Sequence, residues 1–333
     1  MRHAGVLVFA LSAVIMCAQS AWANDRLTNV SYDVSRELFE DLNAVFIAKW
    51  MTDTGRKVEI AQSHGSSSQQ ARAILNGQAA DVVTFNQETD IDTLVDAALI
   101  AADWRKKFPD GASPYYSFPT FLVRAGNPKD IRDWSDLARN DVIPVFPNPK
   151  SSGNGRYTYL AAYAFGLGQS GGNLQKTQDF VRKILSSVPN FDAGGRAATQ
   201  SFTERGIGDV LVTFEAEAGA ITEKYANQRF VRVTPSFSLL AAFPVAVVTA
   251  NAERNGSTDI AIAYLAWLYS PEAQEILARN HYRVRDAKIA AKYAKDFPPL
   301  RLVTVDQVFG GWDKIRMSHL ANGGILDQLL VDK

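Results

Sequence analysis

The sequence has only one cysteine in 333 residues, Cys17, and it lies in an apolar N-terminal segment. Residues 1–23 combine a short basic start, an apolar stretch and Ala-Trp-Ala at 21–23, which predicts a signal peptide cleaved before Asn24 and export to the periplasm. A lipid anchor on Cys17 fits less well, because Met16 is larger than that signal normally accepts. The exported chain then has no cysteine, which excludes disulfides and thiolate chemistry.

An excess of charge of either sign is also lacking. Beyond residue 23 the chain carries 34 basic and 35 acidic residues, so the composition gives no support to nucleic-acid or membrane-surface binding. A second long apolar run is missing too, since Leu239–Ala250 is short and contains Pro244. We see no internal repeat or low-complexity tract.

The usual signatures of catalysis and metal binding are absent. His64, His281 and His319 have no second histidine or cysteine at metal-ligand spacing, and we interpret His64 as structural. The chain has no Gly-x-Ser-x-Gly elbow, no convincing Ser-x-x-Lys set and no Walker pattern. We therefore expect no cofactor, no metal and no enzyme, although a secreted hydrolase that presents Ser152 among glycines is the competing class.

The remaining 310 residues alternate short apolar strands with helical patterns, which predicts an α/β architecture. Examples are strands at 27–32, 80–85 and 209–214 and a helix over 38–50. A chain of this length is too long for one small core, so two lobes are expected.

One loop stands out, Asn148-Pro-Lys-Ser-Ser-Gly-Asn-Gly155, because a helical pattern over 156–165 follows it at once. Pro149 cannot lie within a helix, Ser152 can cap one, and Gly153 and Gly155 allow tight turns. The first amides of that helix lack internal partners and lie at its positive end, which favours an anion. The alternative is an ordinary capped helix start.

Similar junctions recur along the chain. Residues 63–68 precede a helical pattern at 69–76, and residues 191–199 open another helix after two glycines. Asp33, Ser67, Gly195 and the 152–154 turn each stand where a strand or loop passes into a helix, mostly among small residues. None of these junctions brings an obvious cationic ligand, so the pattern favours main-chain and hydroxyl donors.

A further polar segment follows the apolar strand at 80–85. Asn86, Gln87 and Glu88 stand at its carboxyl end, which is where ligands gather in open α/β sheets. They are candidates for a ligand wall, and a solvated loop is the alternative.

Six motifs in matching order give the chain a strong resemblance to the periplasmic sulfate- and thiosulfate-binding proteins of ABC uptake transporters. The resemblance covers nearly all of the chain after residue 23. The motifs are Asn29-Val-Ser-Tyr-Asp33, Gln62-Ser-His-Gly65, Asn148-Pro-Lys-Ser-Ser-Gly153, Glu204-Arg-Gly-Ile-Gly-Asp-Val-Leu211, Tyr269-Ser-Pro-Glu272 and Val308-Phe-Gly-Gly-Trp312.

This resemblance implies a two-lobed periplasmic binding protein fold of type II, with mixed sheets and helices on both faces. It also implies that a bare dianion is held by neutral donors. By motif position the donors are the amides of Asp33, Gly153, Asn154 and Gly195 and the hydroxyls of Ser67 and Ser152. The family's seventh donor is usually an indole N–H, but Phe214 stands there and cannot donate.

Other departures from the family lie near the same residues. Asn154 and Ser66 replace glycines, Gln69 replaces a lysine, and the 86–88 segment replaces a mostly apolar one. Sulfate or thiosulfate is the first expectation. A different or organic oxyanion, such as a sulfonate resting on Phe214, is the second. A Glu88 carboxylate that faces the ligand would repel sulfate and favour a protonated or amine-bearing ligand.

The resemblance also implies hinge closure and docking on the membrane subunits of an ABC transporter, with the binding protein as a monomer. A sensor that uses the same fold is a third possibility. We expect residues 24–117 to form lobe I, joined by 216–243, and residues 118–215 to form lobe II. The segment 244–333 should cross the hinge and pack on both lobes. Hinge crossings are expected near residues 117–121, 214–217 and 240–246.

Overall fold

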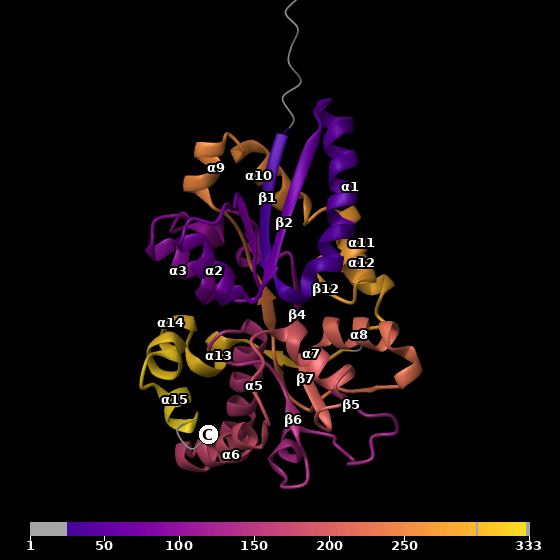
Figure 1. Cartoon of the computed structure of the whole chain (residues 1–333), viewed down its shortest axis with the longest axis vertical. Helices are drawn as coiled ribbons and strands as arrows, with labels where there is room; N and C mark the ends of the chain where they lie inside the picture. The colour runs from indigo at the N-terminus through magenta and orange to yellow at the C-terminus, as the bar shows by residue number, and fades with distance from the viewer. Residues whose placement is uncertain (1–24, 298, 331–333) are drawn as a thin grey trace, which may run out of the picture.

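The computed structural model describes residues 25–297 and 299–330, so the predicted signal peptide lies outside the described residues. The chain forms two lobes, one above the other in Figure 1. The sheet of lobe I has the order β11-β3-β1-β2. Its strands are β1 (Asp25–Tyr32), β2 (Val58–Gly65), β3 (Val82–Thr84) and β11 (Val245–Val247). Strand β1 runs parallel to β2 and β3, whereas β11 is antiparallel to β3.

Helices cover both faces of this sheet. On one face Phe46 of α1 packs against Tyr264 and Trp267 of α10, with ring centroids 5.0 and 5.5 Å away. On the other face Ile74 of α2 and Leu94 of α3 belong to a separate apolar cluster with β3. The helices of lobe I are α1 (Arg36–Thr54), α2 (Ser67–Leu75), α3 (Glu88–Asp96), the short α4 (Pro109–Ala112), α9 (Thr249–Asn255), α10 (Thr258–Trp267), α11 (Pro271–Arg279) and α12 (Ala287–Lys292).

Lobe II is built on the sheet β6-β7-β5-β8. Its strands are β5 (Pro119–Val123), β6 (Pro144–Val145), β7 (Val210–Phe214) and β8 (Val231–Val233). Strand β5 is antiparallel to β7 and β8, and β6 is parallel to β7. Its helices are α5 (Gly153–Gln169), α6 (Leu174–Ser187), α7 (Gly195–Thr203), α8 (Glu215–Lys224), α13 (Val305–Phe309), α14 (Trp312–Ile315) and α15 (Ile325–Leu330).

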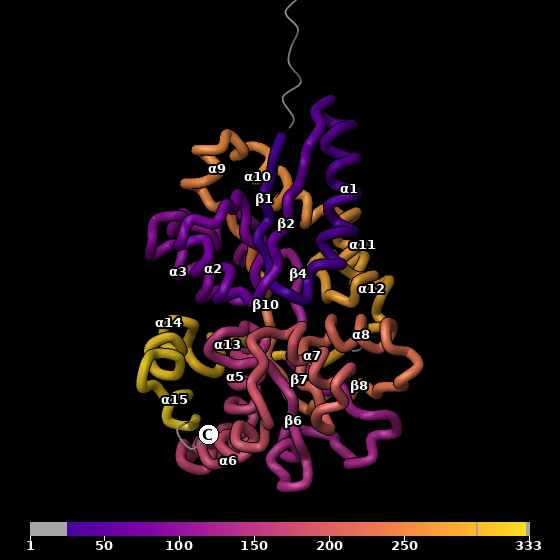
Figure 2. Tube along the Cα trace, in the orientation of Figure 1, coloured from indigo at the N-terminus to yellow at the C-terminus, as the bar shows by residue number. Residues whose placement is uncertain are grey.

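A small sheet of β10 (Ala241–Phe243), β4 (Tyr115–Ser117) and β12 (Arg283–Val284) lies between the lobes. The chain passes from β4 into β5 of lobe II and returns from β10 into β11 of lobe I, as the trace in Figure 2 shows. It leaves lobe I again between β12 and β13 (Leu302–Val303), which pairs with β9 (Ser238–Leu239). The segment 244–333 therefore packs on both lobes.

Two expectations about the lobe boundaries need correction. The segment 216–243 does not return to lobe I as a whole, because α8 follows β7 directly and β8 pairs with β5 in lobe II. For the same reason the chain does not cross between lobes at 214–217. Only β10, at the end of this segment, joins the sheet between the lobes.

Most of the expected helices and strands are present, and the differences fall at polar segments. Residues 88–96 form α3 and residues 215–224 form α8, two helices that were not predicted from the sequence. Both helices begin with glutamates after a buried strand, so their polar starts hide the helical pattern. Strand β2 also extends through Gly65 into what the sequence suggested was a loop.

Candidate functional site

The helix starts that the sequence singled out meet at the junction of the two lobes. Ser152 is the N-cap of α5, and its hydroxyl oxygen accepts from the Gly155 amide at 3.4 Å. The Ser152 carbonyl accepts from the Arg156 amide at 3.0 Å. Helix geometry leaves the amides of Gly153 and Asn154 without an acceptor inside the helix. The predicted cap is therefore present, and the first turn of α5 offers free donors at its positive end.

Gly153 and Gly155 are needed for close approach rather than for a special backbone conformation. Neither has a positive φ. A Cβ on Gly153 would lie 2.1 Å from Oδ1 of Asn86 in the other lobe, and a Cβ on Gly155 would lie 2.3 Å from the Pro147 carbonyl oxygen. Gly153 thus allows the lobes to meet, whereas Gly155 allows lobe II itself to pack.

The start of α7 lies against the end of β1. The Asp33 carboxylate accepts from the Arg196 amide at 3.0 Å, and a Cβ on Gly194 would lie 2.4 Å from Asp33 Oδ2. A Cβ on Gly195 would lie 3.6 Å from both Asp33 Oδ1 and Asn154 Nδ2. Burial raises the pKa of Asp33, and the amide of Arg196 only partly offsets this. These contacts bring Asp33, Asn154 and Gly195 together.

Ser67, at the start of α2, joins the same cluster through Asn86. Its buried hydroxyl donates to the side-chain Oδ1 of Asn86 at 2.7 Å and accepts from the backbone N–H of Asn86 at 3.3 Å. Because Asn86 also meets Gly153, the starts of α2 and α5 lie on either side of it. In this arrangement the Ser67 proton is directed at Asn86, and a short rotation of the hydroxyl would direct it elsewhere.

Phe214 is buried among aromatic rings. Its ring centroid lies 5.9 Å from Tyr157 of α5 and 5.1 Å from Phe243 of β10, both in edge-to-face geometry. A phenyl ring has no hydrogen to donate, so it adds an apolar wall. On the same strand, Thr213 Oγ1 accepts from Asn154 Nδ2 at 2.9 Å, which fixes the Asn154 side chain in lobe II.

Glu88 is engaged within lobe I. Its Oε2 accepts from Arg105 Nε at 3.0 Å, and Arg105 also pairs with Asp92 at 2.8 Å. Burial raises the pKa of Glu88, while the charge of Arg105 lowers it. The carboxylate that would repel a dianion is therefore held by a guanidinium.

Two buried polar side chains at these loops have no hydrogen-bond partner among the described residues. They are the hydroxyl of Ser66 and the carboxamide of Gln87, which is fully enclosed with both Oε1 and Nε2 unpaired. Buried polar groups in folded proteins are nearly always paired, so each of these needs an explanation.

An ion pair between the lobes was not anticipated from the sequence. Arg156 of α5 donates to Asp90 Oδ1 of α3 at 2.9 Å, and the two side chains are 9% and 6% exposed. The same guanidinium donates to Thr89 at 3.1 Å and to Ser68 at 2.6 Å. In the sequence, Arg156 directly follows the glycine-rich turn, but its partner Asp90 is 66 residues away.

Glu217 of α8 is a second residue that sequence reasoning missed. Thr199 and Thr213 donate their hydroxyls to its carboxylate, and Asn154 Nδ2 lies 3.4 Å from its Oε2. Burial raises its pKa to about 7, with a further increase from Asp33. Its hydroxyl and amide neighbours supply no formal positive charge.

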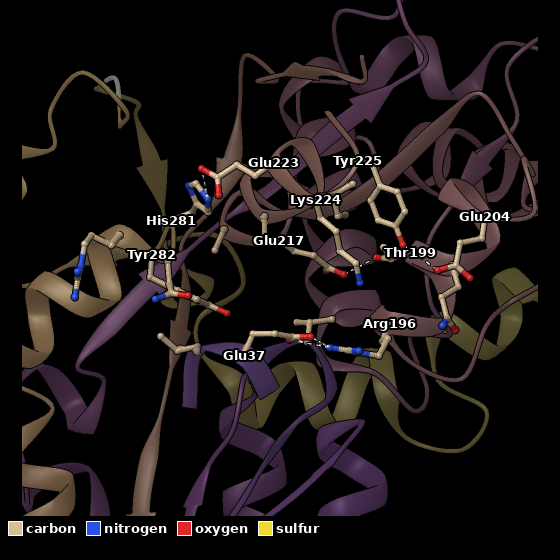
Figure 3. Close-up of a pocket in the computed structure, with 18 residues that line it drawn as sticks. Glu37, Arg196, Thr199, Glu204, Glu217, Glu223, Lys224, Tyr225, His281 and Tyr282 are labelled. Atoms are coloured by element: carbon tan, nitrogen blue, oxygen red, sulfur yellow. Dashed lines mark hydrogen bonds and ion pairs between the residues drawn. The ribbon is translucent and has the colours of Figure 1, made fainter. Parts of the chain in front are cut away.

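A cavity of about 470 Å³ adjoins this region on the side of α1 and α8 (Figure 3). Both lobes line it, and several of its polar side chains contact one another. Arg196 pairs with Glu37 at 2.6 Å, His281 lies 3.3 Å from Glu223, and Tyr225 donates to Glu204 at 2.9 Å. Glu217 and Thr199 stand between this cavity and the Asn154 side chain.

Within residues 25–297 and 299–330 no group of three or more histidine, cysteine, aspartate or glutamate side chains is placed to hold a metal ion. Over the same residues, no helix combines the length and apolar character needed to cross a membrane.

Comparisons with known proteins agree with this architecture. A family model described as bacterial extracellular solute-binding protein matches residues 27–283. The sulfate-binding protein of Escherichia coli is 47% identical over 316 residues, 95% of this chain and 96% of the relative. The thiosulfate-binding protein of the same organism is 49% identical over 323 residues, 96% of this chain and 95% of the relative.

Among solved structures, the sulfate-binding protein SubI from Mycobacterium tuberculosis matches with a TM-score of 0.78 and 35% identity. The match covers 88% of this chain and 98% of that one. The chain therefore belongs to the bacterial extracellular solute-binding proteins and, within them, to the family of sulfate- and thiosulfate-binding proteins.

Proposed function

We propose that this chain is an extracytoplasmic solute-binding protein that captures sulfate or thiosulfate with neutral donors for import by an ABC transporter. The observation that carries the proposal is the contact of the starts of α2, α5 and α7 with one another and with Asp33 at the lobe junction. The donors that we propose there are the amides of Asp33, Gly153, Asn154 and Gly195 and the hydroxyls of Ser67 and Ser152. The nearby guanidinium groups of Arg156 and Arg196 are each paired with a carboxylate.

The energetics favour many short hydrogen bonds. Burial of a bare dianion costs tens of kcal/mol in the idealised limit. Each hydrogen bond to a charged group returns roughly 1.5–3 kcal/mol net, and each helix dipole adds about 0.3–1 kcal/mol. Several donors at the starts of α2, α5 and α7 are therefore needed together.

The donors also provide selectivity. Sulfate and thiosulfate are fully ionised at neutral pH, whereas hydrogen phosphate carries a proton that needs an acceptor. The pairing of Glu88 with Arg105 removes the carboxylate that would have favoured a protonated or amine-bearing ligand. Identity to the sulfate- and thiosulfate-binding relatives is nearly equal, so titration must separate these two ligands.

The proposal is tested by calorimetric titration of the purified protein with sulfate, thiosulfate and phosphate. We expect saturable binding of sulfate or thiosulfate and much weaker binding of phosphate. Ser152→Ala should lower the affinity about tenfold or more, because it removes one donor to a charged ligand. Ser151→Ala is the matched control, since its hydroxyl donates to the Ala193 carbonyl instead. Heat signals absent with both sulfur anions would end the proposal.

The remaining parts of the proposal concern transport. The exported protein, cleaved before Asn24, acts in the periplasm as a monomer. Its lobes close on the anion, and the closed form docks on the membrane subunits of the transporter. The contacts of Arg156 with Asp90 and of Asp33 with the Arg196 amide support closure, because both join the lobes. Mass spectrometry of the exported protein tests the cleavage position.

We propose no turnover for this protein. Its relatives are named as binding proteins, and among the described residues Ser152 serves as a helix cap without a base as its hydrogen-bond partner. Recovery of unchanged sulfate and thiosulfate after incubation with the protein is the expected result; a product that disappears in Ser152→Ala would favour an enzyme.

A further inference from the structure

Gln87 holds hydrogen-bonding capacity that the rest of the described chain does not use. Its side chain is fully buried, and neither the Nε2 donor nor the Oε1 acceptor meets a partner among the described residues. An amide in that position destabilises a protein unless something else satisfies it. The place of this unpaired carboxamide at a fully buried position therefore points to a ligand contact.

The segment around Gln87 faces lobe II on both sides of this residue. Asn86, just before it, would clash with any side chain at Gly153. Thr89 and Asp90, just after it, accept hydrogen bonds from Arg156 at 3.1 and 2.9 Å. Residues on either side of Gln87 therefore touch the first turn of α5, the turn that carries the Gly153 and Asn154 amides.

The donor set described above is incomplete at Phe214. Its ring is occupied by edge-to-face contacts with Tyr157 and Phe243 and cannot donate. A glutamine carboxamide, in contrast, carries two N–H donors without formal charge. This is the same kind of neutral donor as the others in the cluster.

We propose that Gln87 is a ligand-binding residue that donates an N–H from its carboxamide to the bound oxyanion, which replaces the donor that Phe214 lacks. The inference rests on the proposed function. The ligand class is a fully ionised tetrahedral oxyanion, whose oxygens accept at every position. Gln87 also brings an acceptor, so its amide must orient with Nε2 toward the anion.

The test is Gln87→Leu, which keeps the approximate size and removes both polar groups. The affinity for sulfate and thiosulfate, measured by calorimetry, should fall about tenfold or more. The melting temperature without ligand should stay unchanged or rise, because an unpaired buried amide is removed. Gln69→Leu is the matched control, since Gln69 is exposed on α2, and it should keep the wild-type affinity.

A structural role would give a different result. An unchanged affinity in Gln87→Leu overturns the inference, whatever happens to the melting temperature. Gln87→Met provides a second variant without donors if the leucine variant does not fold. At saturating sulfate the variant should reach the compact radius of the wild type in small-angle scattering, and failure to close would also overturn the inference. Wild-type protein that binds neither anion would instead refute the proposed function.

Discussion

Two buried ion pairs at the lobe junction have similar burial but different places relative to the hinge. Arg156 and Asp90 join α5 of lobe II to α3 of lobe I, with side chains 9% and 6% exposed. Arg283 and Glu215 lie 2.6 Å apart with side chains 10% and 2% exposed. Arg283 is on β12 in the sheet between the lobes, and the Glu215 amide donates to the Phe118 carbonyl at the crossing from β4 to β5.

This difference in place decides what each pair can do. In the hinge closure proposed above, atoms at the pivot move least, so we expect the Arg283–Glu215 pair to be kept in the open and closed forms alike. We expect the Arg156–Asp90 pair to form only when the lobes meet. Buried ion pairs add little net stability, but the loss of one partner leaves an uncompensated charge. We therefore expect the pivot pair to govern folding and the outer pair to govern closure.

The largest effect is expected for Glu215→Ala, which removes the buried carboxylate that accepts from Nε and Nη2 of Arg283. The free energy of unfolding should fall by about 3–5 kcal/mol, with or without ligand. Denaturant unfolding followed by circular dichroism measures this change. An unfolding midpoint equal to that of the wild type would show that the Arg283–Glu215 pair does not govern folding.

Asp90→Ala should weaken ligand binding and leave folding largely intact. In the open form Arg156 is hydrated, so the cost of about 3 kcal/mol falls on the closed form and lowers the affinity near 100-fold. Calorimetry gives the affinity, and the ligand-free melting temperature is the control. The double variant Arg156→Met with Asp90→Leu should recover part of the affinity. If Asp90→Ala lowered the ligand-free stability as much as Glu215→Ala, the Arg156–Asp90 pair would contribute to folding in the same way as the Arg283–Glu215 pair.

Glu217 extends the comparison to a buried carboxyl with hydroxyl and amide partners but no guanidinium. Its pKa is raised by burial from 4.5 to about 7, so the folded state holds this proton more tightly than the unfolded chain. Its contribution is thus fully favourable below about pH 4.5 and is lost as the pH rises to about 7. The change is roughly 3 kcal/mol.

The variant Glu217→Gln tests this pH dependence. It keeps the size of the side chain and cannot ionise, so its stability should fall less than that of the wild type between pH 5 and pH 8. Thermal unfolding at several pH values measures both profiles. Parallel profiles would show that Glu217 keeps the same charge in the folded and unfolded chain over this range.

The smallest effect is expected for the exposed pair between the lobes, Arg196 and Glu37, whose side chains are 38% and 59% exposed. Solvent and salt screen such pairs, which contribute about 0.2–1 kcal/mol. Glu37→Ala should lower ligand affinity less than about fivefold, and added sodium chloride should shrink the difference. A loss as large as that of Asp90→Ala would mean that burial does not rank these contacts.

Local sequence was enough to predict the features that depend on neighbouring residues. The Ser152 cap, the start of α5 and the buried β7 strand follow from patterns a few residues long. The sequence suggested that Gly153 is needed for a tight turn. The structure shows that a side chain at this position is excluded by close contact with Asn86 instead. Helices α3 and α8 were not predicted, because each begins with a glutamate after a buried strand and such a polar start resembles a loop.

The α/β alternation, the family and the positions of the helix starts can be predicted from contiguous motifs of the sequence. The pairing of Glu88 with Arg105, the place of β8 in lobe II and the contact of Arg156 with Asp90 became known only from the folded chain. These facts depend on side chains that fold together from distant parts of the chain. Burial then sets which of those contacts carry free energy, and burial is a property of the whole fold.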